Sequence, residues 1–499
     1  MSTLVQSVDW LAIAPPTIAA VVGLVVLVAD LFLDEGRKAL LGWVSVAGLA
    51  VAALTLLPLL DGDRATFCLA GDPHLCSYTA DRFTLVIQFL VLGGALLAAL
   101  LSVTVLEDAK RRIPEGEFWF LLLSSAAGAA LLPASRDLAT LVVALEVASL
   151  PAFALVGMRY GDKRSSEAAL KFFLSSVTAT AVSLMGISFV YASTGSLYLT
   201  QIADRIQHVD GQLHVLAQTG VVLTLVGFAF KTAAVPFHFW VPDTYVGAPL
   251  PVAAYLSVVG KAVGFSGLIL VTVVALPSYS DVWGPALAAL ACLTMTVGNV
   301  GALRQQATRA YSAVRLLAWS SVGQAGYLLV PIAAAGYSKD AQKAIGSTVA
   351  YALMYAAINL GAFAVAALVG RTRTLNRITD YRGLYASNPL AALILAFFLL
   401  CLAGLPPGII GLFAKVTVFS AAVDAGLGWL AVVMAVNVVI ALFYYLQWTT
   451  VLFRAPEGEP EKQRVPAPLT AAIALSGVLG VALSGAPQLV LRFSETGLF

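Results

Sequence analysis

Ionisable side chains stand inside several long apolar stretches of this 499-residue chain. They are Glu146 in LVVALEVASLP, Lys231 in GFAFKTAAVP, Lys261 in SVVGKAVG and Lys415 in GLFAKVTV. A charged residue at the centre of a membrane helix costs about 2.5–3.5 kcal/mol on insertion scales, so it is by default a functional residue. Burial also disfavours the charged form of a lysine. The chemistry that these residues predict is the uptake and release of protons.

Proline stands five residues after Glu146 and five residues after Lys231. Proline lacks an N–H and clashes with the carbonyl four residues back. Pro151 and Pro236 should therefore each free a carbonyl beside a charge, which gives a polar notch that could hold water. Glu146 and Lys231 could instead form a static ion pair, but such a pair would need neither proline.

Two further polar residues lie nearer to the ends or breaks of apolar stretches. Lys171 comes early in its stretch, where a lysine can also extend its ammonium to the membrane interface. His238 follows Pro236 and could transfer protons, stack in a loop or bond to freed backbone. Proton transfer and a purely structural role stay open for both residues.

The elements that must position these residues are membrane helices. The chain is 60% hydrophobic and 11% charged, whereas soluble domains are roughly 45–50% apolar and about 25% charged. A spanning helix takes about 20 apolar residues. We expect an all-α polytopic membrane protein with about fourteen transmembrane helices, near 11–33, 39–60, 83–106, 118–135, 138–158, 168–194, 213–240, 250–276, 283–303, 311–335, 344–370, 389–422, 427–453 and 468–491.

Prolines interrupt the seventh and the twelfth of these segments. Two broken helices five segments apart indicate two inverted five-helix repeats, helices 4–8 and 9–13, because an odd number of helices inverts the second copy. The expected organisation has four parts. They are residues 1–110 with helices 1–3, residues 111–280 with the first repeat, residues 281–455 with the second repeat and residues 456–499 with helix 14.

The distribution of the basic residues predicts how this bundle is oriented in the membrane. Most of the 29 Lys and Arg residues fall in loops after odd-numbered helices, including Lys110 to Arg112, Lys462 and Arg464, and seven fall after even-numbered ones or at the C-terminus. Cytoplasmic loops carry the excess of positive charge, so both termini are expected outside. Asp9 stands where a signal peptide needs a basic region, so the first segment is expected to be a retained anchor.

Several function classes are excluded or disfavoured. The net charge of +2 gives no reason to expect nucleic acid as a partner. The sequence has no nucleotide-binding fingerprint, no Cys-x-x-Cys pair and no haem-attachment motif, so we expect no cofactor and no metal in this chain. Cys292 and Cys401 are expected to be small core residues. Cys68 and Cys76 share a loop that should lie outside, where a disulfide between them could persist.

The stretch from Phe230 to Pro249, FKTAAVPFHFWVPDTYVGAP, resembles the signature of the antiporter-like membrane subunits of proton-pumping NADH:quinone oxidoreductase, respiratory complex I. The L and M types of this family carry His and an acidic residue where Tyr245 and Gly247 stand, so these two residues match the N type. Lys415 agrees, since the M type has glutamate there.

Further matches cover most of the chain from the fourth segment onward. They include Glu146 with Leu150–Pro151, ALKFFL around Lys171, PVAAYLSVVGK ending at Lys261, and RLLAWSSVGQAGY at 315–327. The family often has His where Gln324 stands. Glutamine carries no proton at physiological pH, so a relay in this helix must use water or another side chain.

The resemblance implies roles for the residues and partners for the chain. Glu146, Lys171, Lys231, Lys261 and Lys415 would line a midplane axis. In that axis Glu146 and Lys231 would be a switching ion pair, Lys261 the central relay and Lys415 the contact to the M subunit. Subunits K, J and A would lie on the Glu146 side, the lateral helix of L would cross the bundle, and lipids would surround it in a bacterial plasma membrane. The chain would be a non-redox subunit, with FMN, iron–sulfur clusters, NADH and quinone bound elsewhere in the complex.

Two other functions compete with this one. A cation/proton antiporter subunit of the Mrp type shares the fold, although Tyr245 and Gly247 favour the complex I subunit. A polytopic transferase would need catalytic groups near an outer loop, where the sequence offers only Asp72, His74 and Asp81.

Overall fold

The computed structural model describes residues 8–109, 113–456, 465–495 and 497–499, and most residues in these ranges are helical. Lys110 to Arg112, Lys462 and Arg464 lie outside the described residues. The first half contains α1 Ala14–Asp30, α2 Ala39–Leu54, β1 Arg64–Leu69, β2 Asp72–Ala80, α3 Arg82–Ala109, α4 Glu115–Leu131, α5 Leu138–Val156, α6 Lys163–Thr194, α7 Leu199–Arg205, α8 His214–Thr232, α9 Trp240–Gly247, α10 Leu250–Tyr255 and α11 Lys261–Ile269.

The second half continues with helices only. These are α12 Ser280–Leu303, α13 Ser312–Ala335, α14 Ala341–Gly370, α15 Leu384–Ser387, α16 Pro389–Ala403, α17 Ile409–Asp424, α18 Gly428–Leu452, α19 Ala467–Gly485 and α20 Gln488–Leu491.

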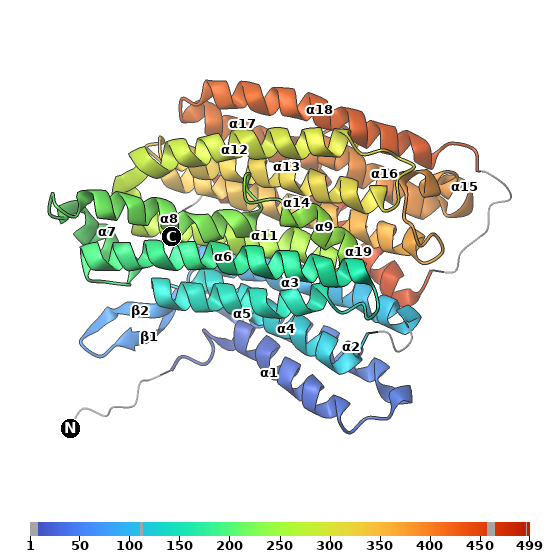
Figure 1. Cartoon of the computed structure of the whole chain (residues 1–499), viewed down its shortest axis with the longest axis horizontal. Coiled ribbons are helices and arrows are strands. Elements are labelled where there is room, and N and C mark those ends of the chain that lie inside the picture. Colours follow the sequence, from blue (N-terminus) through green and yellow to red (C-terminus); the bar gives the residue numbers. More distant parts are fainter. Residues whose placement is uncertain (1–7, 110–112, 457–464, 496) are drawn as a thin grey trace.

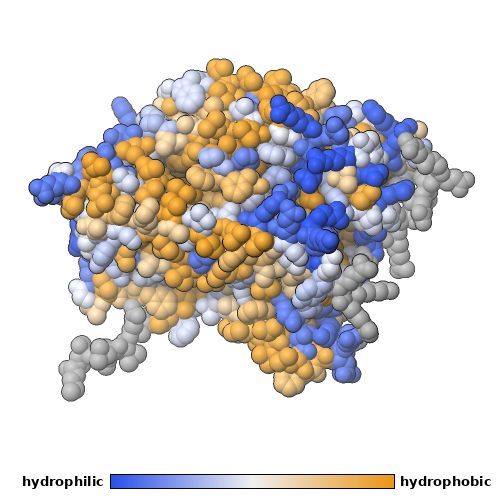
Figure 2. Space-filling model, in the orientation of Figure 1, coloured by the Kyte–Doolittle hydropathy of each residue, from blue (hydrophilic) through white to orange (hydrophobic). Residues whose placement is uncertain are grey.

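The expected all-α membrane fold is confirmed, and each of the fourteen expected segments contains a helix. Among the described residues, twelve helices are long and apolar enough to cross a membrane. The first segment holds the shorter apolar helix α1, and the twelfth is divided into α16 and α17. Hydrophobic residues cover much of the middle of the visible face, as a lipid-facing surface requires (Figure 2).

Both expected helix breaks are present. α8 ends at Thr232, and the next residue, Ala233, is left-handed with φ 70° before α9 begins. α16 ends before Gly404, which has φ 83°, and α17 begins at Ile409. Glycine adopts this conformation without steric cost, whereas Ala233 is held there by its packing, being fully buried.

Two local features differ from the expectation. Pro151 does not open a notch in α5, which runs unbroken from Leu138 to Val156. α4 covers this side of α5, because a Cβ on Gly128 would lie 2.6 Å from the Val147 carbonyl carbon. In the eighth segment the helix instead widens into two π turns, Leu256–Gly260 and Leu270–Ala275.

Residues 61–82, expected to be a loop, contain the hairpin of β1 and β2. The two strands pair antiparallel, with Cys68 opposite Cys76. The hairpin, α7 and the C-terminus lie at one end of the bundle, and α15 lies at the other (Figure 1). We call the first of these the hairpin end. The backbone N–H of Phe83 at the start of α3 donates to the carbonyl of Leu498 there (3.0 Å).

Glycines bring several neighbouring helices into backbone contact. A Cβ on Gly186 of α6 would lie 2.3 Å from the backbone nitrogen of Thr224 in α8, and one on Gly298 of α12 would lie 2.2 Å from that of Gly323 in α13. Small residues allow this close approach in membrane helices, where packing and hydrogen bonds drive association.

Candidate functional site: buried lysines in the helix bundle

Three of the lysines expected to be deep are buried. The exposed fractions of Lys231, Lys261 and Lys415 are 3%, 2% and 5%. Each lies beside an irregular part of a helix: Lys231 before the break after α8, Lys261 directly after the first π turn, and Lys415 in the helix that follows the break after α16. Irregular backbone at membrane depth is tolerated where it is enclosed by protein or lines a cavity.

Lys231 is held by a hydroxyl of α5. Its Nζ donates to Ser149 Oγ at 2.7 Å, and Ser149 Oγ in turn donates to the carbonyl of Leu145 at 2.6 Å. The ammonium also lies 5.2 Å from the ring centre of Phe172 in α6. Aromatic faces attract cations, so this pocket accommodates the charge.

Glu146 lies half-buried on α5, three residues before Ser149. Its Oε1 accepts a hydrogen bond from Thr180 Oγ1 of α6 at 2.7 Å. Among the described residues, no ion pair within 4.0 Å joins Glu146 to Lys231. Each charge is bonded to a hydroxyl, and both hydroxyl partners were missed by sequence reasoning because serine and threonine are common in membrane helices.

Lys261 has a different environment. In the part of the chain that the structure describes, it makes no hydrogen bond and no ion pair. Its turn packs directly on the end of α8, since a Cβ on Gly264 would lie 2.4 Å from the backbone nitrogen of Thr232. The eighth segment is therefore fixed against the residue next to Lys231.

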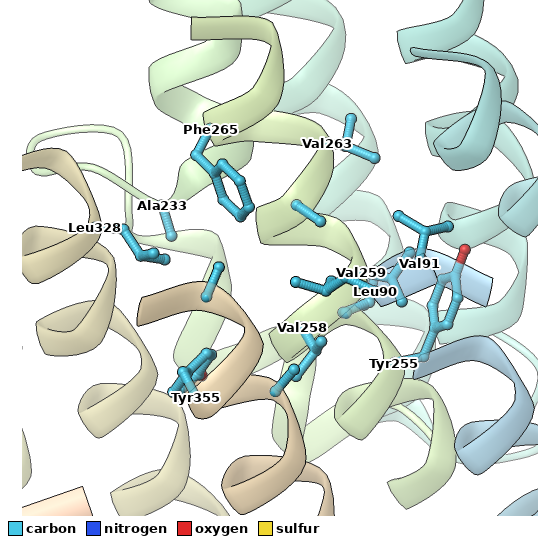
Figure 3. Packing of buried hydrophobic residues seen from close by; sticks show 14 of the residues in the cluster. Leu90, Val91, Ala233, Tyr255, Val258, Val259, Val263, Phe265, Leu328 and Tyr355 are labelled. Atoms are coloured by element: carbon cyan, nitrogen blue, oxygen red, sulfur yellow. The ribbon is translucent and has the colours of Figure 1, made fainter. Parts of the chain in front are cut away.

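A small cavity lies between Lys231 and the turn that precedes Lys261. It has about 10 Å³ open to the centre of a water molecule and is lined by Lys231, Tyr255 and Gly260 among others, which is room for one water. Tyr255 donates to Ser125 Oγ at 2.9 Å. Around it the packing is apolar, with Val258 and Val259 lying between Tyr355 and the α3 side chains Leu90 and Val91 (Figure 3).

Lys415 binds backbone carbonyls at the end of α16. Its Nζ donates to the carbonyls of Leu402 at 2.9 Å and Ala403 at 2.7 Å. The carbonyl end of a helix carries partial negative charge, which stabilises a cation there. The helix break therefore supplies the partner of this lysine.

A second cavity of similar size adjoins Lys415. About 10 Å³ is open to a water centre, and the lining includes Gln324, Tyr351, Tyr355 and Cys401. Gln324 accepts a hydrogen bond from Tyr351 and donates from Nε2 to the hydroxyl of Tyr445 at 3.3 Å. Tyrosine hydroxyls thus surround the glutamine at the position where the family often has histidine.

Hydroxyl and amide groups connect the region of Lys261 with this second cavity. Tyr355 donates to Ser321 Oγ at 3.0 Å and to the carbonyl of Ser257 at 3.3 Å. Asn359 Nδ2 donates to Ser257 Oγ at 2.6 Å. Ser257 belongs to the π turn four residues before Lys261. Sequence reasoning missed Tyr355 and Asn359, although their spacing of four residues in α14 was a readable signal.

Lys171 lies apart from the buried lysines. Its side chain is about half exposed and forms ion pairs with Glu167 (2.6 Å) and with Asp243 of α9 (3.0 Å). Arg315 approaches the other oxygen of Asp243 at 3.7 Å. Asp243 and Arg315 were not among the predicted site residues, although both stand in the motifs that carry the family resemblance.

His238 lies in the break between α8 and α9. Its ring is 5.5 Å from the ring of Trp319, and its Nδ1 is buried without a hydrogen-bond partner among the described residues. At the hairpin, the Sγ atoms of Cys68 and Cys76 are joined. Within the described ranges, no three His, Cys, Asp or Glu side chains gather to hold a metal ion.

The fold and the buried lysines define a polytopic membrane protein of the antiporter-like class. Residues 135–441 match the family described as NADH:quinone oxidoreductase/Mrp antiporter, TM. The chain belongs to this family.

Individual relatives narrow the likeness to subunit N. The chain is 73% identical to NADH-quinone oxidoreductase subunit N 2 of Streptomyces griseus, an alignment that covers 100% of this chain and 95% of the relative. It is 44% identical to subunit N of Salinispora tropica over 90% of this chain and 86% of that one. The resemblance to the N type is therefore confirmed.

Solved structures share the fold. A chain of respiratory complex I from Thermus thermophilus matches with a TM-score of 0.77 and 32% identity, covering 96% of this chain and 98% of that one. A chain of the Mrp complex from Dietzia matches with a TM-score of 0.82 at 22% identity, covering 97% of this chain and 96% of that one. The second likeness shows the common fold alone.

Proposed function

We propose that this chain is the proton-translocating subunit N in the membrane arm of a respiratory complex I. The observation that carries the proposal is the set of three buried lysines, Lys231, Lys261 and Lys415, with water-sized cavities beside Lys231 and Lys415. The half-buried Glu146 lies on the helix that holds Lys231. Groups of this kind at membrane depth mark proton relays. The relatives of the N type support the assembly.

In this proposal Lys231 alternates between two partners. It is bonded to Ser149 in the structure, and Glu146 lies one turn earlier on the same helix. Transfer of the ammonium from Ser149 to Glu146 would form the switching ion pair and vacate its place beside the first cavity. Lys261, with no bonded partner among the described residues, then exchanges a proton through the cavity water.

The second half of the relay runs from Lys261 to Lys415. Ser257, Tyr355 and the second cavity supply hydroxyl groups and space for water between these two lysines. Gln324 contributes hydrogen bonds but no proton, and Tyr351 and Tyr445 beside it can pass one. Lys171 and His238 stay in the proposal as flanking groups.

We place the relay in two inverted repeats, residues 111–280 and 281–455. Support comes from the two helix breaks, each of which begins with a left-handed residue. Residues 1–110 and 456–499 flank the repeats. In the assembly, subunit M lies on the Lys415 side, K, J and A lie on the Glu146 side, and the lateral helix of L and membrane lipids contact the bundle.

Redox chemistry belongs to other subunits in this proposal, with NADH oxidised through FMN and iron–sulfur clusters and a quinone reduced. The membrane is the bacterial plasma membrane, with both termini outside. An Mrp-type antiporter subunit is the second candidate, supported by the shared fold alone.

Substitution of Lys261 tests the proposal. Arginine keeps the charge but effectively never releases its proton in a protein, whereas methionine keeps the length of the chain without a proton. Both Lys261→Arg and Lys261→Met should assemble and pump poorly if Lys261 relays protons. Proton uptake by vesicles containing the reconstituted complex measures this, and Lys163→Arg in the first turn of α6 is the control. An arginine variant that pumps normally would remove Lys261 from the relay.

A further inference from the structure

A polar stripe runs along α14, a helix that is otherwise almost wholly apolar. Lys343, Ser347, Tyr351, Tyr355 and Asn359 follow one another at intervals of four residues, and residues four apart are neighbours on the surface of a helix. From Lys343 to Tyr355 the helix rises by about 18 Å. This is more than half of the roughly 30 Å hydrocarbon thickness of a membrane.

The stripe begins at the hairpin end with Lys343, which forms an ion pair. Lys343 Nζ lies 3.0 Å from Asp424 Oδ2 at the end of α17, and Ser420 Oγ donates to the same oxygen at 3.4 Å. A cavity with about 70 Å³ open to water centres lies here, lined by these residues together with Ser347 and Thr417. Most of the residues that line it are polar or charged, so a water there would find hydrogen-bond partners.

The stripe continues to the cavity beside Lys415. Tyr351 and Tyr355 line that cavity, the second cavity described above, which we call the inner cavity. Ser347 lines the cavity at the ion pair, which we call the outer cavity, and lies one turn, about 6 Å, from Tyr351. α17 also reaches both cavities, with Lys415 at the inner one and Thr417 at the outer one. Two helices therefore line both spaces, and about one turn separates them.

We propose that the Lys343–Asp424 ion pair closes the mouth, at the hairpin end, of the space that α14 and α17 line toward Lys415. The inference rests on the proposed function, since in that function this space carries protons to or from Lys415. The pair suits a closure that opens often, because both side chains are about half exposed and exposed ion pairs are weak.

Accessibility of a cysteine in the outer cavity tests the closure. Ser347→Cys is introduced into the whole complex in vesicles whose hairpin side faces the medium, and its reaction with a membrane-impermeant cationic methanethiosulfonate reagent is followed. Further removal of the pair by Asp424→Asn or by Lys343→Gln should raise the reaction rate about threefold to fivefold, the effect of losing an exposed ion pair. The same complex without Ser347→Cys gives the background.

Asp9→Asn is the matched control, because it breaks another exposed ion pair, Asp9–Arg64 (3.1 Å), at the hairpin end. It should leave the reaction rate unchanged. Equal rates in all backgrounds, or no reaction in any, would overturn the proposal. The labelling reaction does not require turnover of the complex. Normal pumping by Lys261→Arg would therefore reject the proposed function without changing the labelling result.

Discussion

Replacing Ser149 by alanine should slow proton pumping while leaving the fold intact. Ser149 Oγ is the only hydrogen-bond acceptor of the Lys231 ammonium among the described residues, at 2.7 Å. A hydrogen bond to a charged group contributes about 1.5–3 kcal/mol. Without it, the balance between the Ser149 position and the Glu146 position of Lys231 should shift toward Glu146 by about tenfold to a hundredfold.

When the Lys231 ammonium binds Glu146 for longer, it returns more slowly to its position beside the first cavity. We expect NADH-driven proton uptake in reconstituted vesicles to fall about tenfold, the lower bound of that shift. Quinone reduction and the amount of assembled complex are measured in parallel. Ser149→Thr keeps the hydroxyl and should retain most of the pumping.

Ser102→Ala provides the matched control. Ser102 of α3 is buried and donates to the carbonyl four residues earlier at 2.7 Å, as Ser149 does, but no lysine bonds to it among the described residues. Loss of that bond alone should therefore cost little pumping. If Ser149→Ala pumps as well as Ser102→Ala, the hydroxyl does not control Lys231 and the reasoning is refuted.

Two further predictions concern the hairpin end. Removal of the Cys68–Cys76 bridge by serine substitution should destabilise the hairpin by about 2–3 kcal/mol, as a short closed loop implies, and should leave pumping unchanged. The rate of proteolysis of the hairpin measures the loss of stability. A loss of pumping would contradict the prediction. Partial burial raises the pKa of Asp9, but N–H groups of the next turn and the Arg64 guanidinium lower it further, so the pKa lies below its ordinary value. A depressed pKa contributes stability above the pKa of the unfolded chain that is lost as the pH falls through the folded pKa. The protection of the backbone amides in the turn after Asp9 against hydrogen exchange, relative to unfolded peptide at the same pH, should therefore fall in acid, and Asp9→Asn should abolish this pH dependence.

The positions of the buried charges could be predicted from the sequence, but their partners could not. A lysine in an apolar run is visible at once, as Lys231, Lys261 and Lys415 were, because its burial has a large cost. Ser149 and Thr180 are unremarkable in a membrane helix, and their importance depends on which helices pack together. Contacts between separate helices leave no mark in a single sequence.

Helix breaks were predictable in part. The prolines near Val235 and Leu405 indicated both breaks correctly, because several turn-forming residues gather there. Pro151 gave the wrong expectation of a notch, since one proline removes a single hydrogen bond and α4 packs over the gap. Nothing in the apolar run from Leu256 to Gly260 distinguishes a π turn from an α-helix.

The glycine contacts between helices limit the kind of motion that this bundle can make. Where the backbones of α6 and α8 touch at Gly186, and those of α12 and α13 at Gly298, one helix cannot slide along the other without a collision of main-chain atoms, since packed interiors deform little. The two helices of each pair should therefore move together as a rigid unit. Mechanical work that enters the bundle is therefore transmitted mainly by long side chains.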